Sequence, residues 1–297
     1  MIAIFFCAKI YAFNILHGVF DMIVEQIDLY KYFKLPRPEG GRGYLTVYAI
    51  TNSPELDLKR RRPAMLVIPG GAYAFVSDRE AEPVALAYTA HGFCTFVLNY
   101  SIAPACIFPH SLREAAMAMI FIRENAKKYC VDVDSVAAVG FSAGGHLCGC
   151  LGTLYNCEEL SDLPNGDLIR PSAVILSYPV SVSFDPSVSH MGSFNNLTNN
   201  NPELTARLSL EKCVNSFSSP AFIWHTEEDN CVPVEGSLYL ALAYKKNKVP
   251  FCLHIFEKGQ HGISIATDEV NTPNYCAKQW VSLSVDWLKD RGFKIFS

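Results

Sequence analysis

A serine flanked by glycines is the residue best suited to chemistry in this sequence: Ser142, in the Gly-Phe-Ser-Ala-Gly segment at residues 140–144. The segment follows an apolar run at residues 136–139 and precedes a helix-compatible stretch at residues 146–155. A sharp turn between a strand and a helix needs residues without Cβ on both sides of the serine, because the backbone there is strained and tightly packed. Such a turn presents a hydroxyl to a substrate, so the pattern predicts a nucleophile.

A serine hydroxyl at neutral pH is a poor nucleophile unless a base accepts its proton. Of the eight histidines, His261 is the candidate base, because it lies in a Gly-Gln-His-Gly loop directly after the last predicted strand. A side chain on such a loop can reach the carboxyl edge of a parallel sheet. His225 and His254 fall inside predicted strands and are interpreted as packed or surface histidines. His146 lies one helical turn beyond the serine, where its side chain would point along the helix, and is interpreted as a supporting residue.

The histidine in turn needs a carboxylate that fixes its tautomer and stabilises the imidazolium. Asp229 follows the seventh predicted strand and has a turn-forming asparagine beside it, with Glu227 and Glu228 as rival carboxylates. A solvated acidic loop is the alternative interpretation of this cluster. The chain order serine, acid, histidine, with each residue on a loop after a strand, is the order expected of an α/β-hydrolase and favours Asp229.

A glycine-rich loop at residues 69–73, Pro-Gly-Gly-Ala-Tyr, ends the third predicted strand. The tetrahedral intermediate of acyl transfer places negative charge on the carbonyl oxygen, and fixed N–H donors there lower the barrier by several kcal/mol. Glycines let the backbone approach that oxyanion closely, although Gly-Gly also occurs in ordinary turns. The N–H of Ala143 is the expected first donor, and this loop is expected to supply the second.

Eight strand-like segments, rich in β-branched and aromatic residues, are expected to position these loops. They are residues 23–30, 43–50, 64–68, 94–100, 136–139, 173–178, 221–226 and 251–256. From the third strand onward they alternate with segments of helical periodicity at residues 80–91, 112–128, 144–155, 235–246 and 277–289. This alternation predicts an α/β fold whose central eight-stranded, mostly parallel sheet has helices on both faces.

Two regions depart from the alternation. The first two strands are joined by a short Pro- and Gly-rich connection at residues 36–41, too short for a crossover, so they should pair antiparallel at one edge. A longer excursion after the sixth strand, rich in Ser and Asn, is interpreted as a small cap-like insertion at residues 179–219.

Composition limits the classes of function. We interpret residues 22–297 as one large domain, because no linker-like stretch interrupts them. Half of the residues are apolar and the net charge is −4, which gives no electrostatic reason to expect nucleic acid or an anionic membrane. The eleven cysteines lack paired zinc spacing and several fall in apolar runs, which favours a reducing cytoplasm and argues against a bound metal.

Residues 1–21 are apolar and could be taken for a signal peptide. No positively charged segment precedes the apolar run, Lys9 interrupts it, and no small-x-small cleavage site is evident. The run is also too interrupted for a membrane span. We therefore interpret it as an N-terminal extension or start-site artefact, with secretion as the alternative to a cytoplasmic location.

Taken together, the motifs resemble one branch of a known fold family. With the serine turn, the glycine-rich loop, the acid and the histidine in place, the chain resembles the esterase and lipase branch of the α/β-hydrolases. It is most similar to the acetyl-xylan-esterase-like carbohydrate esterases related to hormone-sensitive lipase. The likeness runs from about Met22 to the end and includes residues 79–83, 99–104, 192–194 and 224–226. It implies a serine carboxylesterase that removes short acyl groups, often acetyl, from sugars.

The resemblance also assigns roles to individual residues. Carried across, Gly71 and Ala72 offer oxyanion N–H groups beside that of Ala143. Independently of the resemblance, our candidates for lining the substrate pocket are Tyr73, Tyr100, His190 and Phe194. The sequence departs from relatives in two places: Pro-Gly-Gly-Ala replaces His-Gly-Gly-Gly, and Ser101 stands where many relatives carry Arg. The first change keeps a backbone donor but leaves the shape of the acyl pocket open.

The expected mechanism has Ser142 attack an ester carbonyl while His261, held by Asp229, accepts its proton; water then hydrolyses the acyl-serine, without a metal or organic cofactor. The expected partner is a small ester, and nothing in the sequence tests whether the chain forms a homo-oligomer. A peptidase or arylformamidase of the same fold would share the triad, although such peptidases usually add a large N-terminal domain. A ligand-binding protein that has lost catalysis is the alternative from another class, but such proteins usually lose a triad member.

Overall fold

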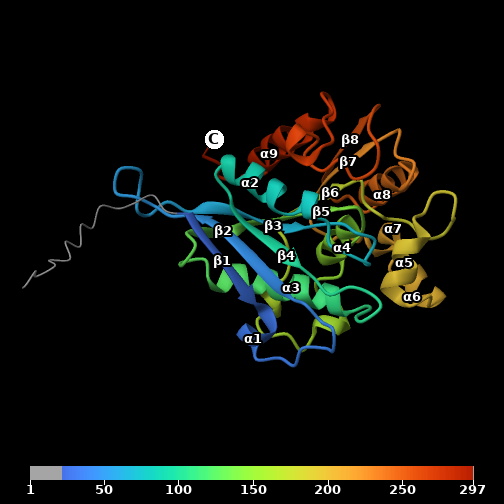
Figure 1. Ribbon diagram of the computed structural model, residues 1–297, viewed down its shortest axis with the longest axis horizontal. Helices are drawn as coiled ribbons and strands as arrows, with labels where there is room; N and C mark the ends of the chain where they lie inside the picture. Colours follow the sequence, from blue (N-terminus) through green and yellow to red (C-terminus); the bar gives the residue numbers. More distant parts are fainter. Residues whose placement is uncertain (1–21, 297) are drawn as a thin grey trace, which may run out of the picture.

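The computed structural model describes residues 22–296, so the predicted extension at residues 1–21 lies outside the described residues. An eight-stranded sheet forms the centre of the molecule (Figure 1), in the order β1-β2-β4-β3-β5-β6-β7-β8. The strands are β1 (Met22–Asp28), β2 (Tyr44–Ile50), β3 (Arg62–Ile68), β4 (Cys94–Asn99), β5 (Val131–Phe141), β6 (Ala173–Ser177), β7 (Ala221–Thr226) and β8 (Phe251–Phe256). β2 pairs antiparallel with both β1 and β4, and the remaining neighbours pair parallel. The predicted mostly parallel sheet with an antiparallel pair at one edge is confirmed.

The central strands are buried on both faces. All seven residues of β3 are buried, and residues 64–68 alternate between two apolar clusters. Leu66 and Ile68 belong to one cluster, whereas Met65 and Val67 belong to the other. The edge strand β1 instead alternates between exposed and half-buried positions. A continuous apolar run such as that of β3 is typical of a parallel strand that helices cover on both sides.

Helices cover both faces of the sheet (Figure 1). The α-helices are α1 (Leu29–Phe33), α2 (Glu82–Ala90), α3 (His110–Glu124), α4 (Ser142–Thr153), α5 (Met191–Thr198), α6 (Pro202–Arg207), α7 (Leu210–Cys213), α8 (Glu235–Lys246) and α9 (Trp280–Asp290). The 3-10 turns are η1 (Asp78–Glu80), η2 (Glu158–Leu160), η3 (Gly166–Leu168), η4 (Asp268–Val270) and η5 (Ala277–Gln279). Residues of α2 and α9 pack into the cluster of Met65, and residues of α3, α4 and α8 into that of Leu66.

Differences from the predicted boundaries have local causes. β7, β8 and α8 begin and end as predicted. β1 ends at Asp28, because the Asp28 carboxylate accepts the N–H of Lys31 and caps the short helix α1. The sequence pattern did not indicate this helix. β5 begins at Val131 rather than at residue 136, since Val131 pairs with Arg62 of β3 before the register shifts. Residues 179–219 contain the three helices α5, α6 and α7.

Candidate active site

Ser142 occupies the sharp turn between β5 and α4. It is the first residue of α4, and its φ of 52° lies in the left-handed region. A Cβ on Gly140 would collide with the carbonyl oxygen of Gly144, and a Cβ on Gly144 would collide with the carbonyl oxygens of Ile68 and Pro69. A non-glycine residue in this region costs about 1–3 kcal/mol and persists only where packing holds it. The predicted reason for the flanking glycines, that no Cβ fits there, agrees with this packing.

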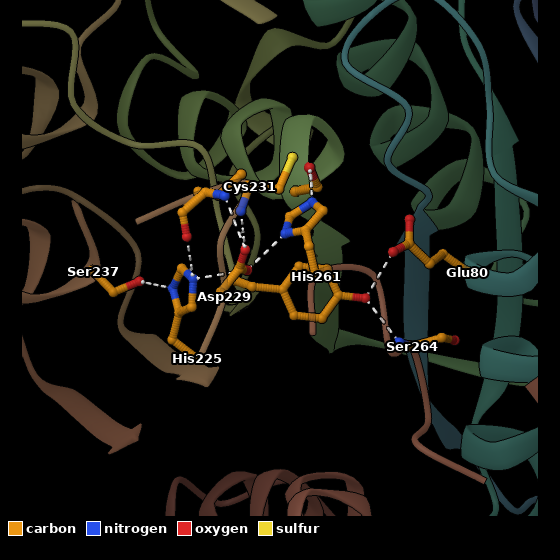
Figure 2. A network of polar contacts seen from close by, with 10 residues as sticks. Glu80, His225, Asp229, Cys231, Ser237, His261 and Ser264 are labelled. Atoms are coloured by element: carbon orange, nitrogen blue, oxygen red, sulfur yellow. Dashed lines mark hydrogen bonds and ion pairs between the residues drawn. The ribbon is translucent and has the colours of Figure 1, made fainter. Parts of the chain in front are cut away.

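Three loops bring Ser142, Asp229 and His261 together. His261 Nε2 lies 2.8 Å from Ser142 Oγ, and His261 Nδ1 lies 2.7 Å from Asp229 Oδ2 (Figure 2). Asp229 follows β7 and His261 follows β8, so the three side chains meet at the carboxyl edge of the parallel strands. An ionised carboxylate only accepts hydrogen bonds, so Nδ1 carries the hydrogen and Nε2 is left to accept the serine proton.

The Asp229 carboxylate is held by four donors. Oδ1 accepts the backbone N–H groups of Cys231 and Val232, each at 2.9 Å. Oδ2 accepts from His225 Nε2 at 3.2 Å in addition to His261. Burial acts to raise the pKa of Asp229, but the hydrogen bonds from His225 and His261 outweigh it and hold that pKa well below its usual range. Asp229 therefore remains ionised wherever the histidine can act as a base.

His225 contacts the acid, a role that the sequence pattern did not indicate. Its Nε2 faces two acceptors, Asp229 Oδ2 and the carbonyl oxygen of Val232 at 2.9 Å, so that nitrogen carries a hydrogen. Its Nδ1 lies 2.8 Å from Ser237 Oγ (Figure 2). The interpretation of His225 as a packed strand histidine is correct about burial but missed this contact. The sequence offered two signals: its position four residues before the acid, and its place in the 224–226 stretch of the family likeness.

The loop at residues 69–73 supplies unpaired N–H groups beside the serine. Gly71, Ala72 and Tyr73 all have positive φ, at 129°, 53° and 57°. Among the described residues, no acceptor is hydrogen-bonded to the N–H of Gly71 or of Ala72, and both residues line the pocket that contains Ser142. Ala143 is the second residue of α4, and the first N–H groups of a helix have no acceptor within it. These three donors suit an oxyanion, and that role stays a prediction.

The serine opens into a pocket of about 190 Å³. Its wall includes His190, which was predicted, and Phe75, Arg79 and Cys231, which were not. Phe75 is 59% exposed, and burial, followed by the charge of nearby His261, lowers the pKa of His190. A larger hollow of about 650 Å³ lies beyond the end of α4, but neither Ser142 nor His261 lines it. The candidate active site is therefore the smaller pocket, because that pocket contains Ser142 and His261.

The other three candidates for substrate binding do not line this pocket. Tyr100 is buried and donates its hydroxyl hydrogen to the carbonyl oxygen of Pro69 at 2.8 Å. Tyr73 is buried and lies with its hydroxyl 2.8 Å from His146 Nδ1. Phe194 packs its ring 5.2 Å from that of His146. Tyr100 thus supports the loop at Pro69, whereas Tyr73 and Phe194 both pack against His146. A large ring next to a glycine loop can fill the core as readily as it can line a binding site.

His146 is a supporting residue, as predicted, and does not contact the serine. Its Nε2 lies 2.8 Å from the carbonyl oxygen of Leu208 and must donate, so Nδ1 accepts from the hydroxyl of Tyr73. Burial lowers the pKa of His146 to about 4, so the ring is neutral at pH 7. The neutral ring joins the loop at residues 69–73 to the chain between α6 and α7.

A family comparison fits this geometry. The BD-FAE family model matches residues 53–244, which is more than half of the chain. The chain belongs to the BD-FAE family. This is an esterase family of the α/β-hydrolase fold, so the predicted fold and branch are confirmed. The matched segment includes Ser142 and Asp229 and ends before His261.

Curated relatives of this BD-FAE chain are longer proteins. It is 40% identical over 220 residues to endo-1,4-beta-xylanase B of Butyrivibrio fibrisolvens, across 70% of this chain and 34% of the relative. It is 29% identical over 216 residues to an acetylxylan esterase of Xylanibacter ruminicola, across 69% of this chain and 42% of the relative. The chain therefore spans about a third to a half of the length of these relatives.

Solved structures match nearly the whole chain. An acetyl ester-xyloside bifunctional hydrolase from Caldicellulosiruptor lactoaceticus is 34% identical, with a TM-score of 0.78 over 91% of this chain and 97% of that one. The carboxylesterase Cest-2923 from Lactobacillus plantarum is 26% identical, with a TM-score of 0.78 over 93% and 99%. The BD-FAE chain thus shares its fold with hydrolases of esters along almost its full described length.

The described residues offer neither a cluster of metal ligands nor a membrane-spanning helix. Within residues 22–296, no three His, Cys, Asp or Glu side chains are grouped as ligands for a metal ion. The helices in this range are all too short or too polar to span a bilayer. The Cys148 thiol is buried in the core, and burial raises its pKa well above its usual range, so it behaves as a small apolar side chain.

Proposed function

We propose that this protein is a serine carboxylesterase that hydrolyses short acyl esters, acetyl above all, carried by carbohydrates such as xylo-oligosaccharides. The observation that carries the proposal is the 2.8 Å contact between Ser142 Oγ and His261 Nε2, with Asp229 held behind the histidine. Membership of an esterase family supports the reaction class. The carbohydrate part draws on relatives named acetylxylan esterase and acetyl ester-xyloside hydrolase.

Acylation begins when Ser142 Oγ attacks the ester carbonyl carbon and its proton passes to His261 Nε2. The carbonyl electrons move to the oxygen, and the N–H groups of residues 71, 72 and 143 receive the resulting negative charge. As the carbon–oxygen bond to the alcohol breaks, the imidazolium returns the proton to the departing alkoxide. Ser142 is then acylated, the alcohol is neutral, and Asp229 has stayed ionised throughout.

Deacylation repeats the same steps with water. His261 Nε2 takes a proton from a water molecule while the oxygen of that water attacks the acyl carbon. The N–H groups of residues 71, 72 and 143 hold the second oxyanion. When the bond to Ser142 breaks, the imidazolium protonates the serine oxygen and the carboxylic acid leaves. The histidine thus changes between base and acid in both halves of the cycle.

The size and lining of the pocket support a small acyl group on a sugar. Its volume of about 190 Å³ is below the roughly 300–1,000 Å³ of sites that enclose drug-sized ligands. The exposed ring of Phe75 offers an apolar surface for a sugar ring, and the guanidinium of Arg79 offers hydrogen-bond donors for hydroxyl groups. An alcohol that extends out of the pocket would contact both.

Acetate release from acetylated xylo-oligosaccharides and nitrophenyl acetate tests the proposal. We expect the intact protein to release acetate. The Ser142→Ala variant should lose at least about 10⁴-fold of kcat/KM, because it lacks the nucleophile, and should keep an unchanged Tm. Ser111→Ala is the matched control, since Ser111 is a buried serine on α3 whose Oγ has no hydrogen-bond partner among the described residues.

Other outcomes would redirect the assignment. Turnover of aminoacyl-proline amides or formyl amides, but of no ester, would point to the peptidase or arylformamidase alternatives. Binding of acetylated sugars without turnover would point to a catalytically silent member of the family. Turnover that survives Ser142→Ala would refute the assigned nucleophile.

A further inference from the structure

A second buried carboxylate, Glu80 of η1, lies beside the triad but takes no part in the mechanism above. It is 3% exposed and forms part of the pocket wall. Its Oε2 accepts the N–H of Gly70 at 2.8 Å, and its Oε1 accepts the hydroxyl hydrogen of Tyr178 at 2.7 Å. Burial raises the pKa of Glu80, and both hydrogen bonds oppose that effect. Burying a carboxylate costs free energy, so the presence of Glu80 in the pocket wall, with a hydrogen-bond donor on each carboxylate oxygen, needs an explanation.

Through Gly70, Glu80 contacts the loop that bears the expected oxyanion donors. Gly70 directly precedes Gly71 and packs so closely that a Cβ on it would lie 2.7 Å from Glu80 Oε2 and 3.0 Å from Ser142 Cβ. The hydrogen bond to Glu80 occupies the N–H of Gly70. That bond fixes the peptide plane just before the two N–H groups that remain unpaired.

Through Tyr178, Glu80 also contacts the loop of the base. The Tyr178 oxygen accepts the N–H of Ser264 at 2.9 Å, so its own hydrogen is available for Glu80 (Figure 2). The Tyr178 ring stands edge-on to the His261 ring, with centroids 5.1 Å apart. Glu80 Oε1 also lies 4.0 Å from where a Cβ on Gly262 would be. One carboxylate therefore braces both loops that face the serine.

We infer that Glu80 is a positioning residue, which holds the oxyanion donors of residues 69–73 and the ring of His261 in register across Ser142. It acts through the N–H of Gly70 and through Tyr178, and it does not touch the reacting atoms. The inference rests on the proposed esterase function and adds to it a residue that the triad does not include. Its negative charge also faces the imidazolium that forms during each half-reaction.

The pH profile distinguishes this role from simple packing. The titratable groups that face His261 are Asp229 and Cys231 after β7, His190 before α5, Arg79 and Glu80 of η1, and Tyr178 after β6. Glu80→Gln removes one negative charge from this set and nearly keeps the shape. Loss of that charge disfavours the imidazolium that forms during the reaction, so the acidic limb of kcat/KM should move to lower pH.

The experiment compares Glu80→Gln, Tyr178→Phe and the double variant on nitrophenyl acetate. We expect each single variant to lower kcat about 10- to 100-fold with less than a threefold change in KM, because the donors and the base are displaced while the pocket stays open. The double variant should cost little more than Glu80→Gln alone, since the two residues act in series. Glu82→Gln is the matched control: Glu82 accepts from Tyr48 at 3.0 Å, away from the site, and its loss should leave kcat and the pH profile unchanged.

The outcomes separate this inference from the proposed function. No turnover by the unmodified protein would refute the esterase assignment itself. Turnover by Glu80→Gln within twofold of the unmodified protein, with an unshifted acidic limb, would overturn the inference while leaving that assignment intact. If Glu80→Gln does not fold, Tyr178→Phe decides: a folded variant with an unchanged kcat would overturn the inference equally.

Discussion

Replacing Asp229 with asparagine tests the central geometry most directly. Four hydrogen-bond donors surround this carboxylate: two backbone N–H groups on Oδ1 and the side chains of His225 and His261 on Oδ2. An asparagine has one acceptor oxygen and one NH₂ group in the same place. If the oxygen stays on the backbone N–H groups, the NH₂ group faces the two histidines, and donors meet donors.

The base can relieve this conflict only by changing tautomer. His261 Nδ1 would then accept from the new amide, its hydrogen would move to Nε2, and Nε2 could no longer take the proton of Ser142. We therefore expect kcat/KM for nitrophenyl acetate to fall about 10⁴-fold, the scale of the wrong tautomer in other Ser-His-Asp enzymes. His225 Nε2 keeps the carbonyl oxygen of Val232 as an acceptor but loses its hydrogen bond to the charged carboxylate, so we expect a loss of about 1 kcal/mol or more of unfolding free energy.

The assay needs folded protein and a control. Urea unfolding at pH 7 measures the stability loss, and titration with a phosphonate that labels active serines reports how much of the reactivity of Ser142 remains. Asp162→Asn is the control, because Asp162 is an exposed partner of Arg113 and such pairs contribute at most about 1 kcal/mol. A folded Asp229→Asn variant with kcat/KM within tenfold of the unmodified protein would refute the assigned acid.

Three further outcomes follow from individual contacts. Gly144→Ala should lower Tm by about 10 °C or more in a thermal melt, because its Cβ meets two carbonyl oxygens of residues 68 and 69; an unchanged Tm would contradict the packing. The lowered pKa of Asp229 adds stability that is complete above about pH 4 and is lost as the pH falls toward that pKa. The unfolding free energy of the unmodified protein, measured in urea, should therefore fall more steeply between pH 5 and pH 3 than that of Asp229→Asn. Parallel slopes would argue against that pKa. Tyr73→Phe leaves the buried Nδ1 of His146 without its donor and should cost about 1–3 kcal/mol of unfolding free energy; a loss below 0.5 kcal/mol by the same assay would refute the bond.

The sequence indicated the fold because its parallel strands are short apolar runs separated by helical segments. β7 and β8 show this most clearly, since both were predicted to the residue. Ser142, Asp229 and His261 could be predicted as a set because each follows a strand, and parallel strands bring such loops to one edge. Their order along the chain predicted the roles, which stay predictions.

The residues that were missed belong to contacts between loops. Tyr178 and Glu80 are 98 residues apart and touch only because the fold places the residue after β6 beside η1. No periodicity or spacing encodes that contact. Phe75 and Arg79 line the pocket for the same reason, whereas Tyr73 and Tyr100, which looked like binding residues, are buried behind the loop. Strand ends can be read from a sequence, but loop packing cannot.

Each part of the site is backed by its own buried polar cluster. His225 contacts Asp229, and His146 contacts Tyr73. Glu80 and Tyr178 contact the loops that contain Gly70 and His261. Buried polar groups stabilise little when satisfied and cost much when one partner is lost. A core of apolar residues could fill the same volume more cheaply, but it would not fix the orientation of a carboxylate or a peptide plane. The clusters therefore serve the geometry around Ser142, and substitutions within them should impair turnover before they unfold the protein.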